Sequence, residues 1–234
     1  MMQTMKKLIP LVATAAAIAV GSGCGKETVS TNATASVATS IVANSGSSGQ
    51  SGTVGTQLAS AISVHVSDQN GNAMKGAVVT WAVVGSGGSV DSTTSHTDAN
   101  GNATTHWTLG NAVGTALLNA SIANGAVVSI TANAVAGLGA SLTKVSGDNQ
   151  TVTGVGTVSA PMVVQLKDVL GNPVSGATIT WSSASGGALS ANSSTTDATG
   201  KAQITVTTAA TPRTYSVQAS ASGAGSVTFT MTGN

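Results

Sequence analysis

The sequence contains very few charged residues. Only 6% of its 234 residues are Asp, Glu, Lys or Arg, and the formal net charge is +1. A nucleic-acid-binding protein presents clustered Lys and Arg side chains to phosphate groups, and this sequence has no such cluster. The scarcity of charge therefore argues against a nucleic-acid partner, and it leaves Ser, Thr, Asn and Gln to hydrate most of the surface.

Cysteine and catalytic sequence patterns are equally scarce. Cys24 is the single cysteine, so no disulfide can form within the chain. The sequence also lacks the metalloprotease HExxH, the phosphate-binding P-loop, the hydrolase nucleophile elbow and the redox CxxC. We therefore expect a protein that is not an enzyme and that has no catalytic, metal-binding or cofactor-binding residues.

The first 23 residues have the pattern of a secretory signal peptide. Lys6 and Lys7 precede an apolar run at 8–20, which is too short to span a bilayer as a helix, and small residues follow. The residues before Cys24 resemble the lipobox of bacterial lipoproteins, although Gly21 stands where that pattern commonly has Leu. The resemblance implies that Cys24 is acylated and anchors the protein at the cell envelope. The alternative is ordinary secretion with an incidental cysteine.

The residues after Cys24 bear on the destination and on the attachment. Gly25 follows the cysteine, so the acidic residue that resembles an inner-membrane retention signal is absent. This favours the outer membrane or the cell surface. Residues 24–38 are small and polar after the cysteine, and they fit a flexible tether between the lipid and the first domain.

Two segments set a hundred positions apart are copies of each other. Residues 64–81 and 164–181 share Val, Asp, Gly, Asn, Gly, Ala, Thr and Trp, which is eight matches in eighteen positions without a gap. The sequence TDANG at 97–101 returns as TDATG at 196–200. A repeat of this length indicates two whole domains, which we place at 39–137 and 138–234.

Apolar residues alternate with polar residues along both domains. Ile62, Val64 and Val66 are separated by polar residues, and a similar alternation leads to Trp81 and to Trp181. Such alternation marks strands with one buried face, and Asn-Gly and Gly-Gly turns separate them. About seven short strands per domain and no helical segment predict an all-β fold. We expect two tandem immunoglobulin-like antiparallel β-sandwiches, with Trp81 and Trp181 facing the core.

The repeated pattern carries a specific resemblance. The pattern V-x-V-x-D-x-x-G-N-x-x-x-G-A-x-x-T-W, then a Gly-Gly loop and T-D-A-x-G, resembles the bacterial immunoglobulin-like group 1 domain of the intimin and invasin family. The resemblance implies rods at bacterial surfaces that project an adhesive or receptor-binding tip. The turn residues that fall on the pattern are Asp68, Gly71, Asn72, Asp98 and Gly101 in the first copy, and Asp168, Gly171, Asn172, Asp197 and Gly200 in the second.

Histidines and a calcium loop are the remaining candidates for a site. His65, His96 and His106 have Gln or Thr at the matching positions of the second copy, and we expect all three at the surface. The segment 68–72 supplies alternating oxygen ligands, but its glycine is misplaced for an EF-hand and no Glu follows at the twelfth position. Short side chains that bind their own backbone explain this segment better. The sequence leaves open a calcium ion at the junction between the domains, with Asp148 or Asp168 as ligands.

These observations lead to one favoured function and two alternatives. The favoured function is a non-catalytic, lipid-anchored cell-envelope protein whose repeats act as a surface spacer and binding module in adhesion, with a protein or glycan ligand. The first alternative is a self-assembling fibre or surface-layer subunit, because edge strands with few Lys or Glu favour homotypic association. The second is a carbohydrate-binding accessory module, for which Trp107 and Tyr215 are candidates because the other copy has no aromatic residue at either position.

Overall fold

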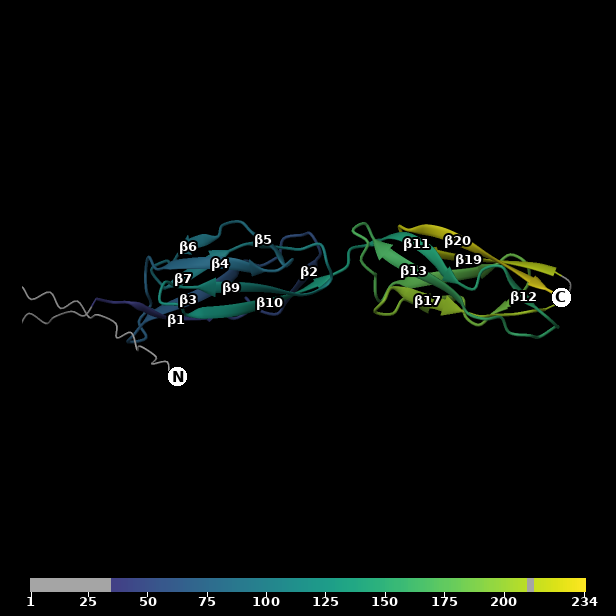
Figure 1. Ribbon diagram of the computed structural model, residues 1–234, viewed down its shortest axis with the longest axis horizontal. Coiled ribbons are helices and arrows are strands. Elements are labelled where there is room, and N and C mark those ends of the chain that lie inside the picture. Colours follow the sequence, from purple (N-terminus) through teal and green to yellow (C-terminus); the bar gives the residue numbers. More distant parts are fainter. Residues whose placement is uncertain (1–34, 210–212) are drawn as a thin grey trace, which may run out of the picture. The chain divides into compact units, whose positions relative to one another are not determined.

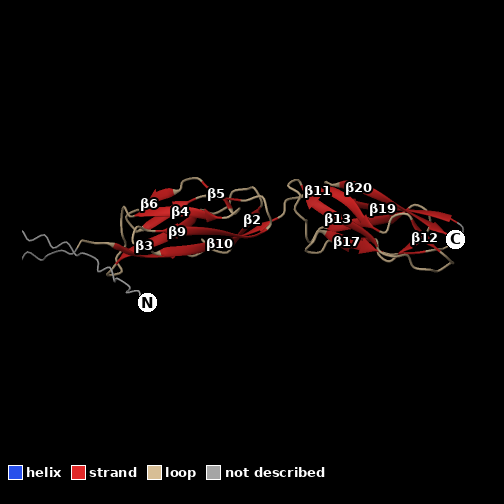
Figure 2. Ribbon diagram, viewed as in Figure 1, coloured by secondary structure: helices blue, strands red, loops and turns tan. Residues whose placement is uncertain are grey.

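The computed structural model describes residues 35–209 and 213–234, and throughout these residues the chain forms strands and turns (Figure 1, Figure 2). The described residues include no helix that is long and apolar enough to cross a membrane. The predicted signal peptide, Cys24 and most of the predicted tether lie outside the described residues. The all-β fold class predicted from the alternating pattern is confirmed.

The first half of the described chain is a sandwich of two main sheets. A three-stranded sheet has the order β1-β3-β7, a five-stranded sheet has the order β2-β10-β9-β4-β6, and β5 pairs with β8. All pairs are antiparallel except β2 with β10, which is parallel. The strands are β1 (Ala38–Ala43), β2 (Gln50–Thr53), β3 (Ile62–Asp68), β4 (Val78–Val84), β5 (Gly88–Val90), β6 (Thr94–His96), β7 (Asn102–Thr105), β8 (Trp107–Leu109), β9 (Gly114–Ser121) and β10 (Val127–Val135).

The second half repeats this arrangement strand for strand. Its sheets have the orders β11-β13-β17, β12-β20-β19-β14-β16 and β15-β18, and its parallel pair is β12 with β20. The strands are β11 (Gly139–Ser146), β12 (Gln150–Val152), β13 (Met162–Asp168), β14 (Thr178–Ser183), β15 (Ala188–Leu189), β16 (Ser193–Thr195), β17 (Lys201–Ile204), β18 (Val206–Thr207), β19 (Arg213–Ala221) and β20 (Gly225–Gly233). Each half has more strands than the predicted seven, because segments such as β7 and β8 bond to different sheets.

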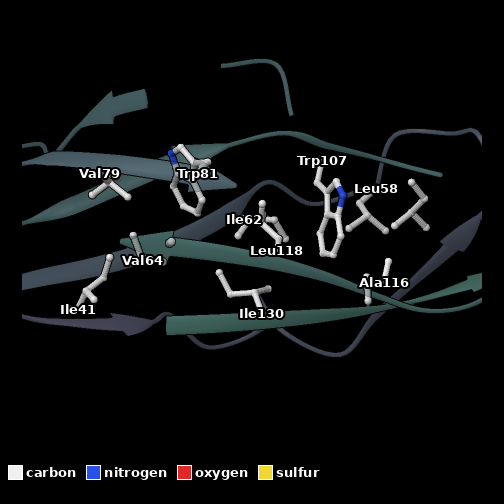
Figure 3. Close-up of a cluster of buried hydrophobic side chains, with 14 of the residues drawn as sticks. Ile41, Leu58, Ile62, Val64, Val79, Trp81, Trp107, Ala116, Leu118 and Ile130 are labelled. Atoms are coloured by element: carbon white, nitrogen blue, oxygen red, sulfur yellow. The ribbon is translucent and has the colours of Figure 1, made fainter. Parts of the chain in front are cut away.

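The core of each sandwich lies between the two main sheets. Strand β3 alternates buried and half-buried residues along its whole length, and Ile62, Val64 and Val66 are fully buried. Trp81 and Trp181 are each 2% exposed, and their indole N–H groups donate to Ser95 Oγ at 2.9 Å and Ser194 Oγ at 2.8 Å. Figure 3 shows Trp81 among aliphatic side chains that converge from both sheets. A hydrogen-bonded indole thus closes each core without a disulfide.

Trp107 and Tyr215 fill equivalent parts of the two cores from neighbouring strands. Trp107 on β8 and Ala116 on β9 correspond, 99 positions later, to Val206 on β18 and Tyr215 on β19. In the first copy the large side chain is on β8 and the small one on β9, whereas in the second copy the small side chain is on β18 and the large one on β19. Trp107, Val206 and Tyr215 are 0% exposed, Ala116 is 7% exposed, and Figure 3 shows Trp107 and Ala116 in the same cluster.

The burial of these two aromatic residues bears on the alternative of a carbohydrate-binding module. All five aromatic residues of the chain (three Trp, one Tyr and one Phe) are at most 2% exposed. Trp107 and Tyr215 are therefore not an exposed platform for sugars. The copies differ at these positions because each core must reach the same packing density with a different pair of side chains.

The exchange predicts a compensating pair of substitutions. Trp107→Val is expected to destabilise the first sandwich by about 3 kcal/mol, because a cavity replaces a buried indole. Ala116→Tyr added to Trp107→Val should recover a large part of that loss, whereas Ala116→Tyr alone should be destabilising because the space is already filled. Urea unfolding of the full chain measures all three variants. If the loss of unfolding free energy in the double variant equalled the sum of the two single losses, the two side chains would not share one space in the core.

Candidate functional site

Four aspartates build four turns of the same geometry. In each turn the Asp Oδ1 accepts hydrogen bonds from the backbone N–H groups two and four residues later, at 2.8–3.0 Å. The glycine three residues after each aspartate has a φ between 73° and 86°, a conformation that side chains disfavour. The four turns are Asp68–Asn72, Asp98–Asn102, Asp168–Asn172 and Asp197–Lys201. The turn residues named from the sequence therefore lie where the chain leaves β3 and β13 and where it passes from β6 to β7 and from β16 to β17.

The second carboxylate oxygen distinguishes two of these turns from the other two. Asp68 Oδ2 accepts from the Ser36 hydroxyl at 2.6 Å, and Asp168 Oδ2 accepts from the Gly137 N–H at 3.0 Å. Ser36 and Gly137 both stand two residues before the first strand of their sandwich. We name these two contacts the N-terminal clasps. Within the described residues, Asp98 and Asp197 make no such contact to a preceding segment.

The N-terminal clasps hold ionised carboxylates in a nearly buried position. Asp68 is 5% exposed and Asp168 is 3% exposed. The Ser36 hydroxyl, followed by the Asn72 N–H, lowers the pKa of Asp68 to about 2. Burial acts to raise the pKa of Asp168, but hydrogen bonds from Asn172 and Gly137 outweigh it and leave that pKa below its ordinary value. Both groups are therefore negatively charged at neutral pH, with their charge satisfied by N–H and O–H donors.

The donor sets around Asp168 and Asp148 do not fit a calcium ion. Asp168 accepts from three backbone N–H groups and the Asn172 side-chain amide, all of which point hydrogens at its oxygens. Asp148 is bonded to the Lys144 ammonium and accepts from the Thr230 N–H at 2.9 Å. Calcium needs several oxygen ligands around it. The part of the chain that the structure describes also contains no group of three or more His, Cys, Asp or Glu residues suited to a metal.

The histidines do not assemble a catalytic group in the described region. His65 is half-buried, with its Nδ1 3.3 Å from Asn102 Oδ1, and His96 is exposed at the end of β6. His106 Nδ1 lies 2.9 Å from Asp91 Oδ2, and both side chains are about half exposed, at 53% and 54%. Two exposed groups of this kind contribute little to stability.

The contact between His106 and Asp91 could not be found from the sequence. The two residues are fifteen positions apart and are joined where β5 pairs with β8. Asp91 also accepts from the Thr105 hydroxyl at 2.6 Å, and this bond, followed by His106, lowers its pKa. The second sandwich has Ser190 and Thr205 at these positions, where the Thr205 N–H donates to Ser190 Oγ at 3.0 Å. A neutral bond at the same place in the second copy favours a structural role for the pair.

Each half is an immunoglobulin-like β-sandwich. Its two sheets face each other, a tryptophan on β4 or β14 is buried between them, and an early strand pairs in parallel with the last strand. The family profile of the bacterial Ig-like domain (group 1) matches residues 142–233. The predicted resemblance to group 1 bacterial Ig-like domains of the intimin and invasin type is therefore confirmed.

Solved structures of bacterial surface proteins resemble the chain. The D0–D1 domain of intimin is 22% identical over 82% of this chain and 98% of that one, with a TM-score of 0.34. The Escherichia coli adhesin FdeC is 18% identical over 83% of this chain and 64% of that one, with a TM-score of 0.51. The Yersinia pseudotuberculosis adhesin InvE is 20% identical over 83% and 58%, with a TM-score of 0.39. The chain spans less than two thirds of the FdeC and InvE structures. No curated protein matches the chain.

The difference between the two kinds of turn predicts unequal effects of the same substitution. Asp168→Asn keeps an oxygen for the turn but places an amide N–H₂ against the donors of Gly137 or Asn172, so we expect a loss of about 2 kcal/mol. Asp197→Asn is the matched control, because all the bonds of Asp197 fall on one oxygen, and it should leave stability almost unchanged. Calorimetry of the full chain compares the two variants. Equal effects would mean that the N-terminal clasp adds nothing to the turn.

The Ser36 hydroxyl predicts the acid response of Asp68. Because the folded pKa of about 2 lies below the ordinary aspartate value of 3.8, the stabilisation is complete above the unfolded pKa and is lost as pH falls through about 2. Ser36→Ala should raise the pKa of Asp68 and move acid unfolding of the first sandwich to higher pH. A carbon-detected NMR titration of the carboxyl groups measures this, with Asp168 as the internal control. An unchanged Asp68 titration would contradict the assignment.

Proposed function

We propose that this protein is a non-catalytic component of the bacterial cell envelope that is anchored by acyl chains on Cys24. Its two sandwiches act as a spacer and as a binding module in adhesion. The match of residues 142–233 to the group 1 Ig-like profile carries the proposal. The repeat of the same strands and turns in the first half supports a surface array rather than a single module.

Adhesion is supported by what similar structures are described as doing. FdeC is an adhesin, invasin is an integrin-binding protein, and a fragment of intimin is solved in complex with the translocated intimin receptor. These activities belong to those proteins, since a shared fold does not determine a ligand. For this chain we propose a protein ligand in preference to a glycan, because its five aromatic side chains are all buried and offer no surface for stacking on sugar rings.

Location at the outer membrane or the cell surface is supported by the N-terminal sequence. The apolar run at 8–20 and the small residues before Cys24 fit export and lipidation. The position after the cysteine, where an acidic residue would resemble an inner-membrane retention signal, is occupied by Gly25. Two or more acyl chains hold a protein at a membrane stably, whereas one chain binds marginally. A polar tether at 25–38 would place the first sandwich beyond the lipid headgroups.

The acyl anchor on Cys24 and the exposure of the protein at the cell surface can both be tested on intact cells. Cells that express the wild-type chain should incorporate a labelled fatty acid into the protein, and external protease should digest the protein while the cells stay intact. Cys24→Ser should abolish the label and release the protein into the medium, because the acyl attachment atom is lost. Ser22→Ala, which keeps the cysteine and a small residue beside it, is the matched control.

The outcomes separate the parts of the proposal. Label that persists in Cys24→Ser would show that the anchor is assigned to the wrong residue. A labelled wild-type protein that resists external protease until the envelope is permeabilised would contradict surface exposure and leave a lipoprotein that faces the periplasm.

A further inference from the structure

The second sandwich has an apolar cavity at the end where the chain enters it. The cavity has a volume of about 330 Å³, and both main sheets contribute to its lining. The lining residues belong to the start of β11, the end of β13, the segment that leads into β14 and the end of β19. Figure 1 shows the start of β11 beside the end of β13, where Gly139 is paired with Asp168. The cavity therefore opens at one end of the core.

The lining of this cavity carries no charge. Leu166 and Ala221 form its buried part, at 2% and 9% exposed, and the half-buried Val174 and Ala177 lie beside them. Glycines and two hydroxyl-bearing residues make up most of the rest. A charged group that entered would lose its hydration and gain no ionic partner in return. The cavity therefore selects an apolar group.

The first sandwich occupies the corresponding place with its own side chains. Met74 stands where the second sandwich has Val174, and the backbone N–H of each donates to the preceding strand at 3.0 Å. Ile122 stands where the second sandwich has Ala221. Met74 packs against the first core, and Ile122 is part of it at 5% exposed. The same region of the fold thus accommodates aliphatic side chains.

The difference between the two copies equals one aliphatic side chain. Gly139 replaces Ala38, and Leu166 replaces Val66. The Leu166 methyl groups take the place of the missing Ala38 methyl, since a Cβ at Gly139 would lie 2.9 Å from them. Over these two positions and the two described above, the second sandwich has four fewer non-hydrogen side-chain atoms. One Leu, Ile or Met side chain has four such atoms.

The size and the rim of the cavity also suit a single side chain. Pockets for drug-sized ligands have volumes of about 300–1,000 Å³, so this cavity lies at the lower end. Leu138 lies at the rim and is 92% exposed, and the neighbouring Gly137 N–H is held by Asp168 Oδ2 at 3.0 Å. A pocket for an apolar anchor with further apolar area beside it is typical of the residues that dominate protein–protein binding.

We propose that this cavity is a binding site for one aliphatic side chain, Leu, Ile or Met, of a protein ligand. The inference rests on the proposed function as a binding module, and it gives that module a specific contact point in the second sandwich. A lipid acyl chain is a poorer match, because it has many more carbon atoms than the four that the second sandwich lacks. The absence of charge in the lining excludes acidic and basic side chains as occupants.

Side-chain analogues test the site in the purified full chain. N-acetyl-leucine methylamide is added in increasing amounts, and the methyl signals of Leu166 are followed by NMR. N-acetyl-aspartate methylamide is the charged control compound. We expect a saturable shift of the Leu166 signals with the leucine compound and none with the aspartate compound, because only the first can enter an uncharged cavity without losing the hydration of a charge.

Variants that copy the first sandwich should fill the cavity. Val174→Met combined with Ala221→Ile restores the four missing atoms and should abolish the shift. Ala221→Ile alone restores three of them and should weaken the binding. The urea midpoint of both variants should stay the same or rise, because the added atoms enter empty space rather than a packed core. Val158→Met, at a position that is 57% exposed and away from the cavity, is the matched control and should keep the shift.

The outcomes separate this site from the proposed function. No saturable shift in the wild type, an equal shift with the aspartate compound, or a shift that persists in the filled variants would overturn the proposal. A lower urea midpoint in both filled variants would also overturn it, since the space would then not be empty. Concentration-dependent sedimentation that the filled variants lose would overturn a separate ligand and assign the cavity to a second copy of this chain. Neither cells nor the acyl anchor enter this test, so a failure of the envelope function appears separately, in the protease experiment.

Discussion

The structure depends on the burial of one apolar face from each of two sheets, with no covalent link between them. Antibody domains reinforce this contact with a disulfide beside a tryptophan, and this chain keeps the tryptophan but has a single cysteine, so no disulfide can form within it. Apolar burial of about 25 cal/mol per Å² is therefore the main attraction between the sheets. This explains why the Trp81 and Trp181 indoles are each satisfied by a serine and why Trp107 and Tyr215 are exchanged with small partners rather than simply lost.

The few charged groups of the chain serve the backbone more than the surface. Hydrogen bonds lower the pKa of five aspartates, and each of the five accepts from a backbone N–H and also from a side chain. These are Asp68, Asp91, Asp148, Asp168 and Asp197. A carboxylate satisfied in this way organises a turn and offers little to a metal or to a charged ligand. The surface that remains is rich in hydroxyl and amide groups, which fits a spacer that avoids unspecific electrostatic contacts.

The entrance of each sandwich is fixed by the same kind of contact. An aspartate that organises a turn also accepts a hydrogen bond from the segment just before the first strand, from Ser36 in the first sandwich and from Gly137 in the second. Each of these N-terminal clasps lies at the start of a sandwich whose early and last strands run parallel. The two copies therefore keep the same closure although the donor is a hydroxyl in one and a backbone N–H in the other.

The sequence by itself determined the fold class, the repeat and the chemistry of the turns, because these follow from short-range patterns. Alternation with a period of two predicts strands, and Asp and Gly three residues apart predict a turn whose Asp caps its own backbone. The resemblance to group 1 domains added the type of sandwich. The tertiary structure alone decided which distant groups meet: the Ser36 and Gly137 contacts with the turn aspartates, and the pairing of Asp91 with His106. These contacts depend on which strand lies beside which, and sheet order is set by packing across the whole core rather than by any local pattern.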